Sequence, residues 1–299
     1  MTSSYFVTDA LPVPSQDAEI TSWLKPPIKR SSSGRLPGGR YSVHVYDQPA
    51  LWMPYARLQN LHDALLHVAR HTMDEVPTYG MFAGDYQAYR HRIVGVVYDV
   101  ETNEPAAFTA MVYLPYEAYG RRELVVHLGL TMIAQAHRKR RLQTPLQRRL
   151  FTLLLVNQRR LGVTVTNIAA SPAGIGAVSD YFQNVFPTYR QDTKQTQVHR
   201  RVATQILQNF RHEFGCSQRA QLDPDTFVVR GSNQPEGGGA HQFLRTDPTS
   251  QYRVQACNAF CAEQLDFARG DELFQVGEAN LLEGLRRSSR RRRAGTTSR

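Results

Sequence analysis

The sequence predicts an α/β (α+β) fold in which a mixed central β-sheet is flanked by helices. A strand-like and a helix-like segment come first, three strand-like segments follow in a row, and a strand between two helices comes last. Consecutive strands with short linkers are typical of antiparallel pairing, and a strand–helix–strand crossover is typical of parallel pairing. The chain has 299 residues, of which 41% are hydrophobic, and this is enough for one or two folded cores.

The first elements follow from residue periodicity. Residues 40–47 alternate apolar and polar side chains, which predicts a strand. Residues 50–71 place leucines at near-helical spacing, which predicts a helix. Residues 74–90 have a mixed composition, and we expect a loop there. Further strands are expected at 91–100, 105–114 and 121–134.

The segment 143–162 is the clearest helix of the sequence, because its leucines fall on one face. Thr144 suits the N-cap, Pro145 the first helical position and Gly162 the C-terminal cap. A strand is expected at 163–171 and a shorter helix at 176–186.

Composition divides the chain into four parts. Residues 1–39 are rich in Pro, Ser and Gly and are expected to form a flexible leader. The predicted αβ domain covers 40–190, a mainly helical C-terminal extension covers 191–285, and a basic tail expected to be disordered covers 286–299. Within the extension, helices are expected at 195–214, 252–268 and 271–285, and a strand at 226–232.

Charge and cysteine content exclude several classes of protein. Seven arginines of the tail account for most of the net charge of +10, and without them the charge is 10 − 7 = +3. The tail is either solvated or attracts nucleic acid by nonspecific, screened electrostatics. No apolar run reaches 18 residues and no export signal is visible, so we expect a cytoplasmic protein without a membrane span. Three cysteines without a CxxC pair predict reduced thiols and no metal site.

A basic loop before the predicted helix 143–162 carries the chemistry. Arg138, Lys139, Arg140 and Arg141 place four cations beside the start of this helix. The first backbone amides of a helix have no partner inside it, and the helix dipole adds positive potential there, so such an end holds phosphates well. The alternative is an ordinary solvated basic turn. The GxSxG, GxxxxGK[ST] and GxGxxG motifs are absent, which argues against hydrolase, P-loop and Rossmann chemistry.

This stretch resembles the GCN5-related N-acetyltransferase (GNAT) superfamily, whose members carry Arg/Gln-x-x-Gly-x-Gly/Ala after their fourth strand. The run 138–143 keeps the leading arginine, but Arg141 and Gln143 replace the two glycines, as in a divergent member. Downstream, Ser171-Pro172, Tyr181 and Phe186-Pro187 are similar to the loop, helix and closing segment of the family. The resemblance implies acetyl-CoA as co-substrate. Its expected binding residues are Met132, Ile133, Ala134, Arg138, Lys139, Arg140, Arg141, Leu142, Gln143 and Thr144.

The resemblance also implies catalytic roles. The strand end 132–134 would stabilise the oxyanion through its backbone, and Tyr181 would protonate the departing thiolate. His127 lies eleven residues before Arg138, where histone acetyltransferases of this family carry a glutamate, and it is the expected base. Glu123 is the second candidate, acting through water. The alternative for His127 is a histidine that only packs in the sheet, and the alternative for Tyr181 is a tyrosine that only packs between helix and sheet.

Three functions remain open at this point. The first is an acyl-CoA-dependent N-acetyltransferase acting on a small-molecule or protein amine. The second is a catalytically silent protein of this fold that acts in binding or interaction. The third, a nucleic-acid-associated protein, is the weakest, because no aromatic residues are interleaved with the tail arginines.

Overall fold

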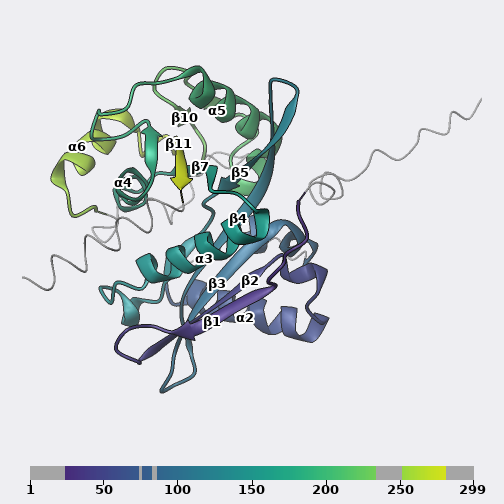
Figure 1. Ribbon diagram of the computed structural model, residues 1–299. Coiled ribbons are helices and arrows are strands. Elements are labelled where there is room, and N and C mark those ends of the chain that lie inside the picture. Colours follow the sequence, from purple (N-terminus) through teal and green to yellow (C-terminus); the bar gives the residue numbers. More distant parts are fainter. Residues whose placement is uncertain (1–23, 74–75, 83–85, 234–250, 281–299) are drawn as a thin grey trace, which may run out of the picture.

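The computed structural model describes residues 24–73, 76–82, 86–233 and 251–280, and the strands of these residues form one mixed sheet (Figure 1). Its strand order is β1-β2-β3-β4-β5-β7-β11-β10-β9, while β6 pairs with β4 and β8 pairs with β11. Among these residues, no helix combines the length and the apolarity that crossing a membrane requires. The mixed sheet with flanking helices confirms the predicted fold class.

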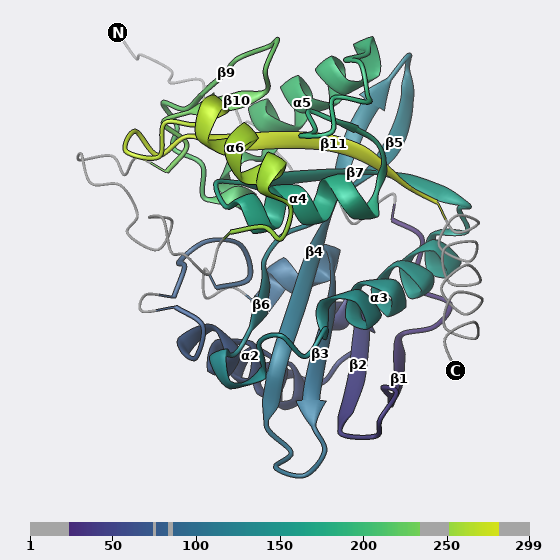
Figure 2. The same cartoon turned by 90° about the vertical axis from the view of Figure 1, so that its left-hand side faces the viewer.

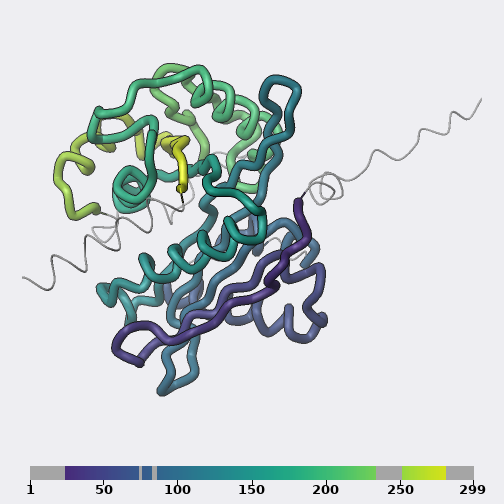
Figure 3. The backbone as a smooth tube through the Cα atoms, in the orientation of Figure 1, coloured from purple at the N-terminus to yellow at the C-terminus, as the bar shows by residue number. Residues whose placement is uncertain are grey.

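The first half of the sheet is antiparallel and follows the predicted order. The strands are β1 (Ser31–Arg35), β2 (Tyr41–Asp47), β3 (Arg92–Asp99), β4 (Pro105–Ala118) and β5 (Arg121–His127). The hairpin of β4 and β5 extends towards α5 (Gln197–Phe210), where Glu117 and Gln205 exchange two hydrogen bonds of 3.2 and 3.1 Å (Figure 3). This contact joins the hairpin to the C-terminal part of the chain.

Two helices cover opposite faces of these strands (Figure 2). The helix α2 (Tyr55–Arg70) packs on Val94 and Phe108, and α3 (Gln143–Gln158) packs on Ile93 and Met111. Gly95 lets α3 lie close to the sheet, because a Cβ there would stand 2.6 Å from a methyl carbon of Leu146. Side chains alternate between the two faces of a strand, and a helix covers each face here. The strands β3 and β4 are therefore buried on both of their faces.

The predicted strand 121–134 is divided in two. β5 pairs in parallel with β7 (Gly162–Ala169), and the last backbone bond between them runs from the Leu128 N–H to the Thr166 oxygen. The chain then bends at Gly129, where a Cβ would stand 2.2 Å from the Ala110 oxygen, and continues as β6 (Thr131–Ile133) along β4. β7 continues instead beside β11, so β6 and β7 diverge at this point.

The C-terminal part carries more helix than strand, as predicted, but its last element differs from the prediction. Residues 271–285 were expected to be helical, whereas Glu272–Asn280 form strand β11, which lies between β7 and β10 (Figure 2). Its apolar residues are buried on both faces, so the alternation typical of a half-buried strand is missing from the sequence. The other elements are α4 (Pro172–Tyr181), β8 (Gln183–Phe186), α5, β9 (Gln221–Leu222), β10 (Val228–Arg230) and α6 (Gln255–Gln264).

Several boundaries also differ. Within the predicted flexible leader, Ser31–Arg35 form β1 and pair with β2. The helix expected at 176–186 begins earlier, at Pro172, because Ser171 caps it through a 3.2 Å bond from the Gly174 amide, and its expected end is strand β8. The basic tail 286–299 lies outside the described residues.

The predicted caps of α3 are wrong. Leu142, not Thr144, occupies the N-cap, which places Pro145 at the third helical position. At the other end, Arg159 in the left-handed region (φ 51°) is the C-cap, and Gly162 already belongs to β7.

Candidate functional site

The basic loop lies between β6 and the first turn of α3. Arg138 is partly buried, and its guanidinium donates a 3.3 Å hydrogen bond to the Thr72 oxygen. Lys139, Arg140 and Arg141 are exposed, and within the described part of the chain their side chains make no hydrogen bond or ion pair. The loop therefore presents three cations to solvent beside a helix start.

The backbone of this loop adopts a conformation that favours glycine. Lys139 has φ 65° and Arg141 has φ 57°, both in the left-handed region. Arg141 stands at the first glycine position of the GNAT motif, so the loop keeps the glycine-like turn although the glycine is absent. Left-handed geometry costs an ordinary residue about 1–2 kcal/mol. The strain is concentrated beside the start of α3.

The start of α3 has the features of an anion-binding helix terminus. Its N-cap residue Leu142 offers no side-chain acceptor to the first amides, and no acidic residue lies in the first turn. The amide groups of Gln143 and Thr144 therefore have no capping carboxylate or hydroxyl. With the three exposed cations, they form a positive surface.

Tyr181 is brought to this helix start. It is the last residue of α4 and 36% exposed, and its hydroxyl shares a hydrogen bond with the Thr144 hydroxyl in the first turn of α3. The structure therefore places the predicted proton donor beside one of the predicted cofactor-binding residues.

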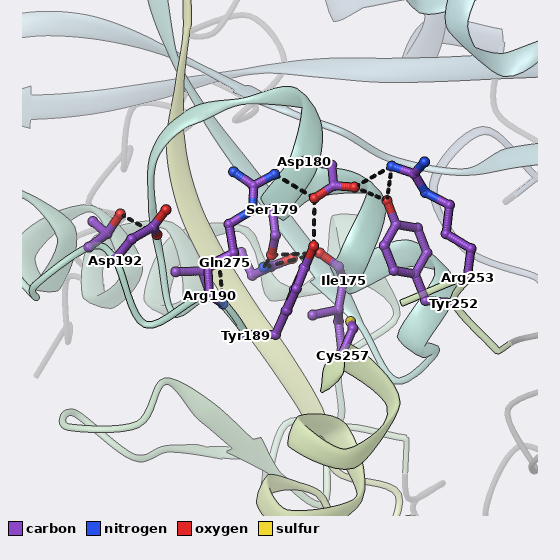
Figure 4. A network of polar contacts seen from close by, with 12 residues as sticks. Ile175, Ser179, Asp180, Tyr189, Arg190, Asp192, Tyr252, Arg253, Cys257 and Gln275 are labelled. Atoms are coloured by element: carbon purple, nitrogen blue, oxygen red, sulfur yellow. Dashed lines mark hydrogen bonds and ion pairs between the residues drawn. The ribbon is translucent and has the colours of Figure 1, made fainter. Parts of the chain in front are cut away.

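A polar network holds the end of α4 in place (Figure 4). The carboxylate of Asp180 accepts hydrogen bonds from Tyr189 (2.7 Å), Arg190 (2.5 Å), Arg253 (2.6 Å) and Tyr252. Partial burial raises the pKa of Asp180, but these four donors together lower it below its usual range. Since Asp180 precedes Tyr181, the network fixes the position of Tyr181 from the C-terminal part of the chain.

His127 is buried on the face of the sheet that carries α2. Its Nδ1 lies 3.1 Å from the Thr166 hydroxyl, and its ring centroid is 4.0 Å from that of Phe214. Burial lowers the pKa of His127 to about 3; Glu213 opposes this shift and Arg92 adds to it. The imidazole is therefore neutral at physiological pH and can accept a proton, but as a weak base.

Glu123 lies away from His127. It is four residues earlier on β5, or roughly 13 Å along a strand. Its carboxylate is 44% exposed and forms a 2.8 Å ion pair with Arg160. The structure does not bring the two candidate bases together.

Among the described residues, the strand end 132–134 directs one backbone N–H away from β4. The Ala134 amide donates to the Ala106 oxygen, and the Ala110 amide donates to the Leu130 oxygen. Hydrogen-bonded pairs alternate along an antiparallel ladder. The backbone N–H of Met132 therefore also points towards β4, whereas the N–H of Ile133 points away from β4. Ile133 is thus the residue of this group whose amide is directed towards the side where β7 diverges.

A small cavity of about 50 Å³ lies beside His127. Its polar walls are His127, Arg92, Glu213 and Tyr79, and its apolar walls include Ala110 and Ile168. Glu213 forms an ion pair with Arg92 and receives the His91 Nε2 at 3.2 Å, and these contacts lower the pKa of Glu213 below its usual range although burial opposes them. Sequence reasoning missed both Arg92 and Glu213, because they are 121 residues apart and belong to no local motif.

Within the described residues, no group of three or more His, Cys, Asp or Glu side chains is arranged to hold a metal ion. The predicted site residues fall into two groups: the loop 138–144 with Tyr181, and His127 with the cavity. Glu123 belongs to neither.

No family model and no curated protein sequence matches this chain significantly. Among solved structures, it is similar to NAA60 of Arabidopsis thaliana in complex with a bisubstrate analogue, at 9% identity and a TM-score of 0.37, over 80% of this chain and 99% of that one. It is also similar to an aminoglycoside acetyltransferase from an uncultured soil metagenomic sample, at 14% identity and a TM-score of 0.28, over 40% of this chain and 74% of that one. A third is a conserved protein of Enterococcus faecalis, at 10% identity and a TM-score of 0.33, over 48% of this chain and 32% of that one.

The chain thus spans about a third of the Enterococcus protein. Similarity at this level assigns no activity to this chain.

Proposed function

We propose that this chain is an acyl-CoA-dependent N-acetyltransferase that transfers an acetyl group from acetyl-CoA to the amine of a small molecule or a protein, in the cytoplasm. The observation that carries the proposal is the left-handed backbone of Arg141 at the glycine position of the motif. Backbone strain that coincides with a candidate binding loop supports a functional role for the turn. The exposed cations of the loop supply the charge that a pyrophosphate requires.

In the proposed reaction, the amine nitrogen attacks the thioester carbon, a C–N bond forms and the C–S bond breaks. His127 accepts one proton from the nitrogen. The amide of Ile133 donates to the oxygen that becomes negative in the transition state. Tyr181 gives its phenolic proton to the departing thiolate and regains one from solvent. The products are the acetylated amine and coenzyme A.

Isothermal titration with acetyl-CoA tests the binding step. The informative variant combines Arg140→Ala with Arg141→Gly, because it removes two exposed cations while glycine retains the left-handed turn. Arg138 is left intact, since its bond to Thr72 is structural. Arg121→Ala is the matched control, because Arg121 is an exposed arginine at the start of β5, beside the β4–β5 turn.

We expect micromolar binding to the wild type, at least tenfold weaker binding to the double variant and unchanged binding to the control. An absence of binding to the wild type at millimolar acetyl-CoA would rule out the enzyme.

A second candidate function is a catalytically silent protein of this fold used for interaction. The observation that favours it is the pKa of His127, which at about 3 makes a weak base. For this second function, we expect the protein to bind acetyl-CoA without acetylating any of a panel of amines. We also expect His127→Gln to leave the slow hydrolysis of acetyl-CoA unchanged.

A further inference from the structure

The cavity beside His127 is built on one row of residues that crosses the sheet. Arg92 on β3 pairs with Val112 on β4, Val112 pairs with His127 on β5, and His127 pairs with Thr166 on β7. Directly paired residues share a face of the sheet, so these side chains all point to the same side. Strands lie about 4.8 Å apart, which places the Cα atoms of Arg92 and His127 roughly 10 Å from each other, with Val112 forming the floor between them.

Arg92 carries a donor that the protein leaves unused. The residue is 3% exposed, and one of its terminal guanidinium nitrogens pairs with Glu213, but its Nε–H is buried without a hydrogen-bond partner in the described structure. Buried polar groups are nearly always hydrogen-bonded, so an unpaired donor on a cavity wall is open to an acceptor atom from a ligand or a water molecule. A guanidinium with a free Nε–H is suited to a carboxylate oxygen.

Glu213 supplies the opposite charge to the same cavity. Its side chain is 6% exposed. Its Oε2 pairs with Arg92, and its Oε1 lies 3.2 Å from the His91 Nε2 and 3.8 Å from the His212 Nε2, the latter too far for a hydrogen bond. A carboxylate has about four acceptor positions, so two remain for a ligand. The cavity thus offers one cationic donor and one anionic acceptor next to the neutral His127.

We propose that the acceptor amine is the α-amino group of a small free amino acid. Its carboxylate binds the Nε–H of Arg92, and its amino group lies between Glu213 and His127 after the ammonium form has released one proton to solvent. His127 then accepts the second proton as the amine attacks the thioester. This inference rests on the proposed function, because it names the substrate of that reaction. Burial is the main cause of the lowered pKa of His127 and the charge of Arg92 the smaller one, so a carboxylate bound at Arg92 offsets only the smaller contribution.

The cavity volume limits the size of this acceptor. One water molecule needs about 10–15 Å³ of such space, so the cavity of about 50 Å³ admits roughly four heavy atoms. This is about one fewer than the five heavy atoms of the ammonium, the α-carbon and the carboxylate of an amino acid, so it leaves no room for a large side chain or a folded protein segment.

Ligand-observed NMR on the full-length protein tests the assignment, with and without saturating coenzyme A. The probes are L-alanine, ethylamine, propionate and the peptide Ala-Ala-Ala. L-Alanine is expected to bind at least tenfold more tightly than ethylamine or propionate, because only L-alanine carries both charges. Arg92→Lys keeps the ion pair with Glu213 but loses the Nε–H, and it is expected to weaken L-alanine at least tenfold. Circular dichroism and the melting temperature establish that this variant folds.

Equal binding of ethylamine and L-alanine by the wild type overturns the assignment, and this comparison needs no variant. Tighter binding of the peptide overturns it in favour of a protein N-terminus. If the wild type binds acetyl-CoA but none of the probes, the acceptor assignment fails while the proposed function stands. If L-alanine binds in the predicted order but acetyl-CoA does not bind, the proposed function fails and the cavity is an amino acid site without the transferase.

Discussion

At the scale of single residues, Arg141 carries backbone strain in the loop of the site. Its φ of 57° is unfavourable for a residue with a Cβ, whereas glycine adopts it freely. We therefore expect Arg141→Gly to raise the free energy of unfolding by about 1 kcal/mol. Urea denaturation measures this change.

Arg140→Gly is the control for this prediction. It removes the same charge from the same loop, but Arg140 is not among the residues with positive φ. Glycine there only increases the entropy of the unfolded chain, so we expect a loss of about 0.5–1 kcal/mol. If Arg141→Gly and Arg140→Gly change the free energy of unfolding in the same direction, the backbone at Arg141 is not strained.

His127 makes the stability of the protein depend on pH. Its pKa is about 3 when folded and about 6.5 when unfolded. The unfolded chain therefore binds the proton first, and stability is lost as the pH falls from about 6.5 towards 3. Between pH 7.5 and 5 this group should remove about 2 kcal/mol.

Denaturation of the wild type and of His127→Gln over this pH range measures that contribution. The variant is expected to lack this part of the slope, whatever its absolute stability. Parallel curves for the two proteins would mean that the imidazole is not buried in its neutral form.

At the scale of elements, α4 depends on the Asp180 network. Asp180→Asn keeps the size of the side chain but removes its charge and its pairing with Arg190 and Arg253. Hydrogen bonds to charged groups contribute about 1.5–3 kcal/mol, so we expect a loss of about 2 kcal/mol in unfolding free energy.

The matched control is Asp192→Asn, at an exposed aspartate (Figure 4) whose carboxylate, within the described residues, accepts a hydrogen bond from Thr193 alone, at 3.4 Å. It should change stability by less than about 0.5 kcal/mol. Thermal unfolding of both variants decides the matter, and equal melting temperatures would show that the network does not hold α4.

The elements also show how far the sequence predicts this structure. Local periodicity identifies β2, α2 and α3, because each has a regular apolar pattern over many residues. It fails for β1, whose sequence SSSGR has no apolar residue and which is held by backbone pairing with β2. It also fails for β11, where burial on both faces removes the alternation.

The residues of the site likewise divide into those that the sequence predicts and those that it does not. The loop 138–144 could be found because its residues are consecutive and its charge is visible in the sequence. Arg92 and Glu213 could not, because only the tertiary fold brings them to one cavity. The caps of α3 were predicted wrongly, since residue type alone does not reveal that Thr144 bonds to Tyr181 instead of capping the helix.

At the scale of the whole molecule, the end of the described chain supports its centre. β11 pairs with β7 over the full length of that strand, from Leu273 opposite Ala169 to Asn280 opposite Gly162. The ring of Phe274 is fully buried and lies 6.4 Å from that of Phe214, which in turn packs on His127. The region beyond residue 190 is therefore expected to fold together with the sheet rather than as an independent unit.

Phe274→Ala tests this cooperativity. Loss of a buried phenylalanine costs about 3–5 kcal/mol, and Glu278→Ala, at an exposed position of the same strand, should cost less than about 0.5 kcal/mol. Because β5 and β7 lie in the same sheet as β11, hydrogen exchange of the Val125 and Val165 amides should accelerate in Phe274→Ala together with that of β11. If only the amides of β11 and its C-terminal neighbours accelerate, the two parts unfold separately, and residues 40–190 form a domain that does not need β11 for its stability.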